Sequence, residues 1–590
     1  MYSVFGKLTG KQTSLILPSD TPSQYLPDKF NSFFVDKISK IRTQLDSVTC
    51  LYSHFDTDYS GTVLNSFDSI SPDDLKKIIA KCNKSFCELD FLPEHLYNEC
   101  FDILLPHITS VFNQSLATGI FPTEFKQSLV IPLLKKPSLD CNILKNYRPV
   151  SNLSFTSKVL ERIIFNQLIN HISNNDLIEK FQSAYKAGHS TETALLKVVN
   201  YLLCFIDKGN ISVLTMLDLS AAFDTIDHTI LLKRLSDTFG IRDKALLMIQ
   251  TYLQDRHQKI KINNLYSDEL PVSFGVPQGS VLGPLLFTMY IYPIKDVINK
   301  EIFNYHLYAD DTQLYSCYKS TTIDNAISQI PSCTSDINHW MTANKLKMNG
   351  DKTEIMLCGS IPKLNNVQID SINIDNDPIE ISDHVRNLGF FLDKHLNMNV
   401  HVSNLRKSCY FELRKISYIR PYINEKCAAQ LVVSLVLSKL DYCNCLFYNM
   451  SSENFNKLQL VQNHAARIVK KASKRDSAMS IMFELHWLPI RYRVSFKIAL
   501  IVFKCLNVEN FPSYLKDLIS IYTPSRTLRS SDSLLLNKPV MKLFTFGDKA
   551  FCFAAPEVWN DLPSDVRFTN SISIFKKKLK TFYFKKAFYS

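Results

Sequence analysis

Acidic residues follow two apolar stretches of the chain, at the points where each stretch ends. Asp218 comes directly after residues 211–217, and Asp310 and Asp311 stand in a polar turn inside residues 304–315. Carboxylates on adjacent strand ends can hold two divalent cations, of which one activates an attacking hydroxyl and the other stabilises a leaving phosphate. Mg²⁺ prefers such oxygen ligands. Taken alone, each acidic site is equally typical of a helix N-cap or an ordinary solvated turn.

The segments around these acids predict the elements that position them. Residues 211–217 are mostly apolar and predict a buried strand, which we expect to lead into a helical segment over residues 221–223. Residues 304–315 predict a hairpin with the two acids at its tip. The expected fold class is α+β, and from about residue 400 the pattern is mostly helical, with helices predicted over residues 427–440, 455–471 and 492–506.

The acids also belong to an ordered set of motifs. Residues 217–224 read Leu-Asp-Leu-Ser-Ala-Ala-Phe-Asp, residues 274–284 read Phe-Gly-Val-Pro-Gln-Gly-Ser-Val-Leu-Gly-Pro, and residues 308–311 read Tyr-Ala-Asp-Asp. In this order they resemble motifs A, B and C of reverse transcriptases, in the form found in LINE-type (non-long-terminal-repeat) retrotransposons.

Further segments extend the resemblance over nearly the whole chain. Residues 146–151, with Lys158 and Glu161, resemble the first finger motif, and residues 181–191 resemble the second. Residues 345–354 resemble motif D, and residues 387–389 resemble motif E, the primer grip. Three later segments resemble the C-terminal region of jockey-like elements: residues 438–444, 485–489 and 554–560.

The resemblance implies a right-hand polymerase of fingers, palm and thumb, with an antiparallel palm sheet. We expect a linker-like N-terminal region over residues 1–114, a reverse transcriptase domain of fingers and palm over residues 115–393, and a basic, helical thumb and C-terminal region over residues 394–590. Residues 28–38 look like the linker that joins an endonuclease to the polymerase in relatives. Because only about 110 residues precede the finger motifs, we expect the chain to lack that endonuclease.

The implied reaction is RNA-directed DNA synthesis, in which a primer 3′-hydroxyl attacks the α-phosphate of a deoxynucleoside triphosphate and pyrophosphate leaves. The implied partners are an RNA template, a DNA primer and dNTP, and the implied cofactors are two Mg²⁺ ions, with Mn²⁺ as the alternative. Asp218 and Asp310 would be the metal ligands, and Asp311 a supporting carboxylate. Lys352 would protonate the pyrophosphate, although it is equally well explained as a solvated lysine.

Five residues are expected to bind the incoming nucleotide. Phe223 stands at the steric gate, where a ring would crowd a 2′-hydroxyl, and its alternative is a core phenylalanine. Gln278 and Gly279 would lie under the nascent base pair, where glycine lets the backbone come close to template or nucleotide. Arg148 and Lys186 would reach the triphosphate. Many relatives have arginine in place of Lys186, and lysine lacks its planar fork.

Composition excludes several other classes of protein. With 46% hydrophobic and 21% charged residues, the 590-residue chain is not disordered as a whole. Its 15 scattered cysteines contain no C-x-x-C pair, which argues against a disulfide framework and a zinc knuckle. No apolar run is long enough for a membrane span, and residues 1–7 do not resemble a signal peptide. We therefore expect an intracellular protein of the cytoplasm or nucleus, whose oligomeric state stays open.

Charge is segregated along the chain. Residues 401–590 carry 30 Lys and Arg against 13 Asp and Glu, whereas residues 1–400 carry 37 against 43. The basic half would neutralise template and primer phosphates without regard to sequence. Residues 575–586 interleave lysines with rings, which predicts either single-stranded nucleic-acid binding or, as the favoured reading, an amphipathic terminal helix with a lysine face.

Two other functions stay open at this point. The chain could be a catalytically idle retroelement remnant that only binds nucleic acid, although the acids needed for catalysis are present. It could also be an RNA-dependent RNA polymerase, which shares the palm, although Phe223 argues against this because its ring would crowd a ribonucleotide.

Overall fold

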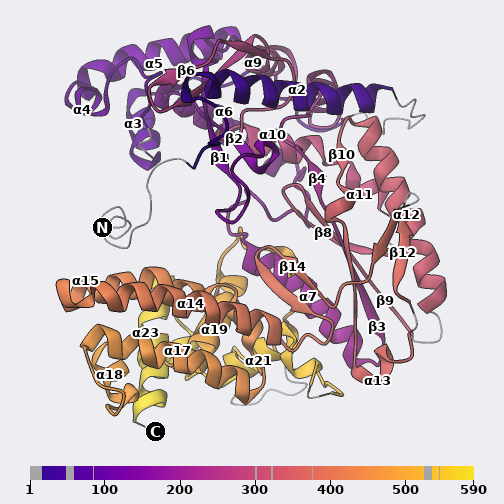
Figure 1. The fold of residues 1–590 in the computed structure, drawn as a ribbon, viewed down its shortest axis with the longest axis vertical. Helices are drawn as coiled ribbons and strands as arrows, with labels where there is room; N and C mark the ends of the chain where they lie inside the picture. Colours follow the sequence, from indigo (N-terminus) through magenta and orange to yellow (C-terminus); the bar gives the residue numbers. More distant parts are fainter. Residues whose placement is uncertain are drawn as a thin grey trace.

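The computed structural model describes residues 16–47, 59–83, 86–298, 302–319, 323–367, 369–374, 377–523, 534–543 and 545–589, which include every candidate site residue. Residues 1–7, from which the absence of a signal peptide is predicted, lie outside these ranges. The fold mixes helices with several separate sheets, as the α+β prediction requires. Figure 1 shows the C-terminal helices, orange to yellow, gathered in one body next to α7 (Thr191–Asp207).

A four-stranded antiparallel sheet carries the three acids, and its order is β11-β3-β9-β8. These strands are β3 (Ile211–Leu217), β8 (Asn304–Tyr308), β9 (Asp311–Tyr318) and β11 (Glu354–Cys358). The predicted strand and hairpin are both confirmed. Leu217 pairs with Thr312, and Tyr308 pairs with Asp311, so the end of β3 and the tip of the β8–β9 hairpin meet at one edge of the sheet.

Strand β3 is buried throughout and mostly apolar because both faces of this sheet are covered. Successive side chains of a strand point to opposite faces. Val213 and Leu217 enter the core formed with the N-terminal helices, whereas Leu214 and Met216 enter the core formed with the C-terminal helices. A strand buried on both faces gives a continuous apolar run and not an alternating one.

A second sheet has the order β2-β1-β5-β6, with β7 also paired to β5. Its strands are β1 (Ser128–Leu134), β2 (Tyr147–Asn152), β5 (Arg256–Ile262), β6 (Leu265–Tyr266) and β7 (Leu270–Val272). Helix α2 (Leu26–Asp46) lies across it and buries Phe30 and Phe34 against Tyr147 and Ile260. Residues 28–38, which resemble a linker, are therefore part of a packed helix.

The remaining helices before residue 399 cover the two sheets. Their bounds are α3 (Pro72–Lys81), α4 (Glu94–Glu99), α5 (Phe101–Thr118), α6 (Phe155–Asn174), α8 (His228–Asp237), α9 (Asp243–Leu253), α10 (Gly283–Tyr290), α11 (Ile294–Val297), α12 (Ile323–Ala343) and α13 (Ile361–Leu364). Two small hairpins follow, namely β12 (Ser371–Ile374) with β13 (Asp377–Glu380), and β14 (His384–Asn387) with β15 (Phe390–Asp393).

The helical segment predicted over residues 221–223 is wrong. The chain forms the short strand β4 (Leu219–Ser220), which pairs with β10 (Lys347–Met348), and then turns. Ala221 has φ of 54°, a left-handed conformation that does not continue a helix. The next helix, α8, begins only at His228 and is capped by Asp227, whose side chain accepts a hydrogen bond from the Ile230 amide.

The region after residue 399 is helical, as predicted. Its helices are α14 (Asn399–Ile419), α15 (Glu425–Val432), α16 (Ser438–Asp441), α17 (Ser452–Lys470), α18 (Ala478–Glu484), α19 (Ile490–Asn507), α20 (Ser513–Lys516), α21 (Phe551–Asn560), α22 (Ser564–Arg567) and α23 (Ile572–Phe588). Phe575, Leu579 and Tyr583 are buried on one side of α23, which confirms the amphipathic terminal helix. Within the described ranges, no helix is both long and apolar enough to cross a membrane.

Candidate active site

The three acids stand together at the edge of the four-stranded sheet. Asp218 follows β3, and Ala309 and Asp310 form the turn between β8 and β9. Ala309 takes a left-handed φ of 55°, which lets the hairpin close within two residues. Asp311 is the first residue of β9. The sequence separation of more than ninety residues between Asp218 and the hairpin is thus closed by the β3–β9 pairing.

Asp218 is held by the segment that resembles motif D. Lys352 Nζ lies 2.7 Å from Asp218 Oδ2, and the Asn349 amide donates to the Asp218 carbonyl oxygen at 2.9 Å. The Asp218 carboxylate is therefore turned towards an ammonium group. As the side chains stand, the described part of the chain holds no group of three or more His, Cys, Asp or Glu side chains that could bind a metal ion.

The electrostatics of the acids nevertheless fit a cation. Burial, together with the charges of Asp310 and Asp218, raises the pKa of Asp311 to about 7, against the opposing effect of Lys352. Burial and the Asp218 charge also raise the pKa of Asp310. Three carboxylates facing one ammonium group leave uncompensated negative charge, and the donors are all oxygens. Both properties suit a hard divalent cation.

Gln182 fixes the hairpin tip, a role that its sequence position did not indicate. Gln182 Oε1 accepts hydrogen bonds from the amides of Ala309 (3.1 Å) and Ala184 (2.9 Å). The amide of Ser183 donates to the Leu307 carbonyl, and the amide of Leu307 donates to the Phe181 carbonyl. The segment that resembles the second finger motif is thus bound directly to the strand that leads to Asp310.

Phe223 lies half-buried in the turn after Asp218. Its ring stacks on Phe287 of α10 at a centroid distance of 4.6 Å and meets Tyr185 edge-on at 6.4 Å. Tyr185 keeps 53% of its surface exposed. Its pKa is raised mainly by the burial of the rest of the residue and then by the negative charge of Asp310. The ring of Phe223 therefore packs on Phe287 and Tyr185, and Tyr185 in turn lies close enough to Asp310 to feel its charge.

Gln278 is anchored by a second acid of the same turn. Gln278 Nε2 lies 2.9 Å from each carboxylate oxygen of Asp224. Burial raises the pKa of Asp224 to about 6, while the hydrogen bonds from Gln278 act in the opposite direction. An ionised carboxylate only accepts hydrogen bonds, so Asp224 fixes the orientation of the Gln278 amide. This partner was not assigned from the sequence.

Gly279 permits a close contact within the chain itself. A Cβ on Gly279, whose φ is 124°, would lie 2.5 Å from the carbonyl oxygen of Ser151 in β2. The Ser151 amide donates to the Gln278 carbonyl at 2.8 Å. The close approach that glycine permits is therefore between two parts of this chain, which bring the loop that resembles motif B against the second sheet.

The two predicted phosphate-binding cations lie in different surroundings. Arg148 on β2 is exposed. The pKa of Lys135 is lowered mainly by burial and then by the positive charges of Lys37, Lys352 and Arg148. These cations surround the Asp218 side of the site, and Lys135 was not identified from the sequence. Lys186 instead donates to the Glu179 carbonyl at 2.9 Å, and burial lowers its pKa to about 8.

Comparison with known proteins identifies the region that contains all these residues. A family model described as "Reverse transcriptase (RNA-dependent DNA polymerase)" matches residues 134–392. Residues 134–392 are a reverse transcriptase domain. The match includes every candidate residue, from Arg148 to Lys352, and all four strands of the sheet that carries the acids.

The relatives of this chain come from mobile elements. It is 25% identical over 421 residues to the RNA-directed DNA polymerase from mobile element jockey of Drosophila melanogaster. The aligned region covers 68% of this chain and 44% of that protein. It is 26% identical over 385 residues to the probable RNA-directed DNA polymerase from transposon BS of the same species. That aligned region covers 62% of this chain and 40% of the relative. The predicted resemblance to jockey-like reverse transcriptases is confirmed. The chain spans less than half the length of these relatives.

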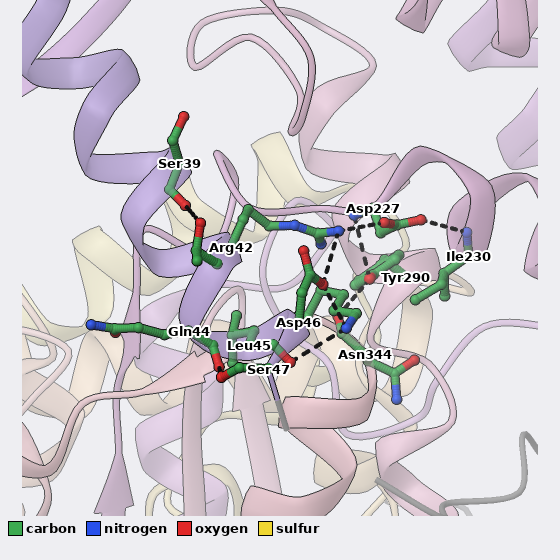
Figure 2. A network of polar contacts seen from close by, with 12 residues as sticks. Ser39, Arg42, Gln44, Leu45, Asp46, Ser47, Asp227, Ile230, Tyr290 and Asn344 are labelled. Carbon is green, nitrogen blue, oxygen red and sulfur yellow. Dashed lines mark hydrogen bonds and ion pairs between the residues drawn. The ribbon is translucent and has the colours of Figure 1, made fainter. Parts of the chain in front are cut away.

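Helix α2, which precedes the matched region, is tied to the reverse transcriptase domain by a polar network (Figure 2). Arg42 Nη2 lies 2.7 Å from Asp227 Oδ2, and the Arg42 guanidinium lies over the ring of Phe274, 4.5 Å from its centroid. Asp46 pairs with Lys345 Nζ at 2.6 Å. The end of α2 thereby joins the segment after the one that resembles motif A to the first residue of the segment that resembles motif D.

Arg42→Ala is expected to destabilise the protein by about 2–3 kcal/mol, because it leaves the largely buried Asp227 carboxylate without its counter-ion. Asp227 also caps α8, so helix capping is weakened as well. Urea unfolding at neutral pH measures the change. Lys40→Ala, which removes an exposed cation from the same helix, is the control and should change stability by under about 0.5 kcal/mol. Equal effects of the two variants would contradict a bracing role for Arg42.

Proposed function

We propose that this chain is the RNA-directed DNA polymerase of a non-LTR retrotransposon, which transfers nucleotides from dNTP to a primer 3′-hydroxyl on an RNA template. The observation that carries the proposal is the reverse transcriptase domain in which Asp218, Asp310 and Asp311 meet at one sheet edge. Acidic side chains at adjacent strand ends, next to a cluster of cations, suit the transfer of a nucleotidyl group from a triphosphate to a hydroxyl, with pyrophosphate as the leaving group.

Asp218 and Asp310 would hold the divalent ions, Mg²⁺ or Mn²⁺, with Asp311 as support. When bound, such ions activate the primer hydroxyl and neutralise the leaving pyrophosphate. Asp218 must first release Lys352, with which it is paired. The released ammonium group would then stand beside the departing pyrophosphate, where it can donate a proton. Lys135 and Arg148 approach the same site and would bind the triphosphate, whereas Lys186 would have to leave the Glu179 carbonyl to do so.

The remaining residues of the turn would select the nucleotide. Phe223, supported by Phe287, would exclude a 2′-hydroxyl by its bulk. Gln278, oriented by Asp224, would present its carbonyl oxygen to the nucleotide and nascent base pair, because its amide nitrogen is already used. Gly279 would serve indirectly, by allowing the Gln278 loop to rest against Ser151.

We further propose a right-hand layout. The second sheet would form the fingers, the four-stranded sheet the palm, and the helices from α14 onward the thumb and C-terminal region. The boundaries are residues 1–114 for the linker-like N-terminal region, whose helix α2 packs on the second sheet, 115–393 for fingers and palm, and 394–590 for the thumb and C-terminal region. In support, the palm sheet separates the two large cores, so the C-terminal helices pack on the face opposite the N-terminal ones.

Helix α14 offers a surface for the primer–template duplex. Lys407, Phe411, Arg414 and Tyr418 are exposed at spacings of four, three and four residues, which places them on one side of the helix. The opposite side, including Leu405 and Leu413, is buried in the C-terminal core. Where α14 ends, a hollow of about 380 Å³ is lined by basic side chains, among them Arg420, His464, Arg467, Lys471 and Lys474. Cations and rings in one row suit a nucleic-acid backbone and its bases.

Reversing both charges of this row, in Lys407→Glu with Arg414→Glu, is expected to weaken primer–template binding and to reduce the slope of log affinity against log salt concentration by about 2. Fluorescence anisotropy across a salt series measures both quantities. The control reverses two exposed lysines of α23, Lys577 and Lys580, and should leave the slope nearly unchanged. Equal slopes for the two double variants would contradict a specific role for α14.

Primer extension tests the proposed function. The full chain is incubated with a DNA primer on an RNA template, with either deoxynucleotides or ribonucleotides, and with Mg²⁺ or a chelator. We expect extension with deoxynucleotides and Mg²⁺ only. Ribonucleotide incorporation at a comparable rate would favour an RNA polymerase. Binding of primer–template without any extension would favour an idle nucleic-acid-binding remnant.

A further inference from the structure

The turn of the β14–β15 hairpin lies between the palm sheet and the C-terminal helices. Leu388 and Gly389 form this turn, with φ of 46° and 83°, as a two-residue turn with both central residues left-handed. Phe390, the first residue after the turn, is fully buried and stacks on His401 of α14 at a centroid distance of 3.7 Å. The hairpin is thus fixed at its base, and only the turn projects.

One anchor of the hairpin comes from the catalytic strand. Asn387 Nδ2 donates to Gln313 Oε1 at 2.8 Å, and both side chains are fully buried. Gln313 lies two residues after Asp311 on β9. The start of the turn is therefore held within a few residues of the acids.

The second anchor comes from residues 438–444, a segment to which the polymerase chemistry assigns no role. The Tyr442 hydroxyl donates to the Leu388 carbonyl oxygen. A Cβ on Gly389 would lie 3.6 Å from the same hydroxyl. The raised pKa of Tyr442, caused mainly by burial, also reflects the charge of Tyr308, which precedes the catalytic turn. The Tyr442 hydroxyl thus contacts the Leu388–Gly389 turn directly.

Tyr442 is itself held rigidly. Asp441 accepts hydrogen bonds from Nε and Nη2 of Arg493 on α19, the first at 2.8 Å. Cys443 takes a left-handed φ of 50° and is buried, and Asn444 is buried against Asp441. The backbone on both sides of Tyr442 is therefore fixed to the C-terminal helices, and its hydroxyl transmits their position to the turn.

We propose that Tyr442 is a positioning residue that sets the Leu388–Gly389 turn against the catalytic turn and thereby holds the primer end of the duplex. The proposal rests on the proposed polymerase function, because a primer 3′ end has to lie beside Asp218 and Asp310. A turn fixed from β9 on one side and from Tyr442 on the other forms a boundary next to that position. The residue would act on primer binding and leave nucleotide binding unchanged.

Tyr442→Phe tests the proposal, since it removes only the hydroxyl. The Kd for a labelled DNA primer on an RNA template is measured by anisotropy without nucleotides. We expect it to rise about fivefold to tenfold, because one hydrogen bond that positions the turn is lost. The KM for primer–template should rise by a similar factor, while the KM for dNTP, kcat at saturating primer and Tm stay unchanged.

Tyr492→Phe is the matched control. Its hydroxyl donates to the Lys586 carbonyl at 3.1 Å, in the same helical region but away from the hairpin. Unchanged Kd in Tyr442→Phe, an equal change in Tyr492→Phe, or a fall in kcat at constant KM would each overturn the proposal. The Kd is measured without nucleotides and does not depend on primer extension, so it tests the role of Tyr442 even if the wild-type chain extends no primer. Failure of the wild-type chain to extend a primer would contradict the proposed polymerase function separately.

Discussion

Asp310→Asn is expected to lower the rate of primer extension by at least about 10³-fold, because a preorganised charge at the reacting phosphate is lost. The carboxamide has nearly the same shape as the carboxylate, so the hairpin should keep its geometry. Burial and neighbouring acids already raise the pKa of Asp310 and Asp311. Removing one negative charge relieves this repulsion, so stability at neutral pH should stay equal or rise. Single-turnover extension and thermal unfolding measure the two effects.

Asp351→Asn is the control for this result. Asp351 is exposed and lies next to Lys352, so the substitution removes an acid close to the site but outside the three-carboxylate group. We expect extension to change less than about twofold, as for a typical surface substitution. If Asp310→Asn kept more than a tenth of the wild-type rate, the assignment of Asp310 as a metal ligand would be wrong.

Phe223→Val is expected to reduce discrimination against ribonucleotides by about 10²-fold, because the ring that would meet the 2′-hydroxyl is removed. The ring of Phe223 stacks on Phe287 and meets Tyr185 edge-on. Valine loses both ring contacts and leaves space beside the turn. The ratio of kcat/KM for a deoxynucleotide to that for the matching ribonucleotide measures the effect. Extension with deoxynucleotides should fall much less.

Phe112→Val separates selection from stability. Phe112 is a fully buried phenylalanine of α5 and lies in the core away from the acids. We expect it to lower Tm at least as much as Phe223→Val does, with no change in discrimination. If both variants kept the wild-type discrimination ratio, Phe223 would be a core residue only, which is the alternative that the sequence left open.

The parts of the fold that were predicted correctly depend on local patterns. Residues 211–217 are recognised as a strand because both faces of the sheet are covered, which favours a mostly apolar run. The hairpin over residues 304–315 combines two strand-like runs with a short polar turn. The helix expected over residues 221–223 was predicted from composition alone. Ala221 instead takes a left-handed turn, because the β4–β10 pairing holds the chain before it and the Val276 amide donates to the Phe223 carbonyl after it.

The parts of the site that were missed depend on contacts between distant residues. Gln182 holds Ala309, which is 127 residues away, and Asp224 orients Gln278 across 54 residues. No spacing rule predicts such pairs, because each partner is an ordinary polar residue in its own segment. Lys135 was missed for the same reason, since its place among the cations follows from the packing of the second sheet. The packing of helix α2 was not predicted either, because its apolar residues face a sheet that the sequence does not reveal.

The central claim is that this chain copies RNA into DNA, and omission of single nucleotides tests it most directly. A labelled DNA primer on an RNA template of known sequence is extended by the full chain with Mg²⁺ and three of the four deoxynucleotides. We predict that synthesis stops one position before the first template base that calls for the missing nucleotide, and that the stop moves when the template is changed. Products that are the same on every template, or no extension by a chain that still binds primer–template, would contradict the account.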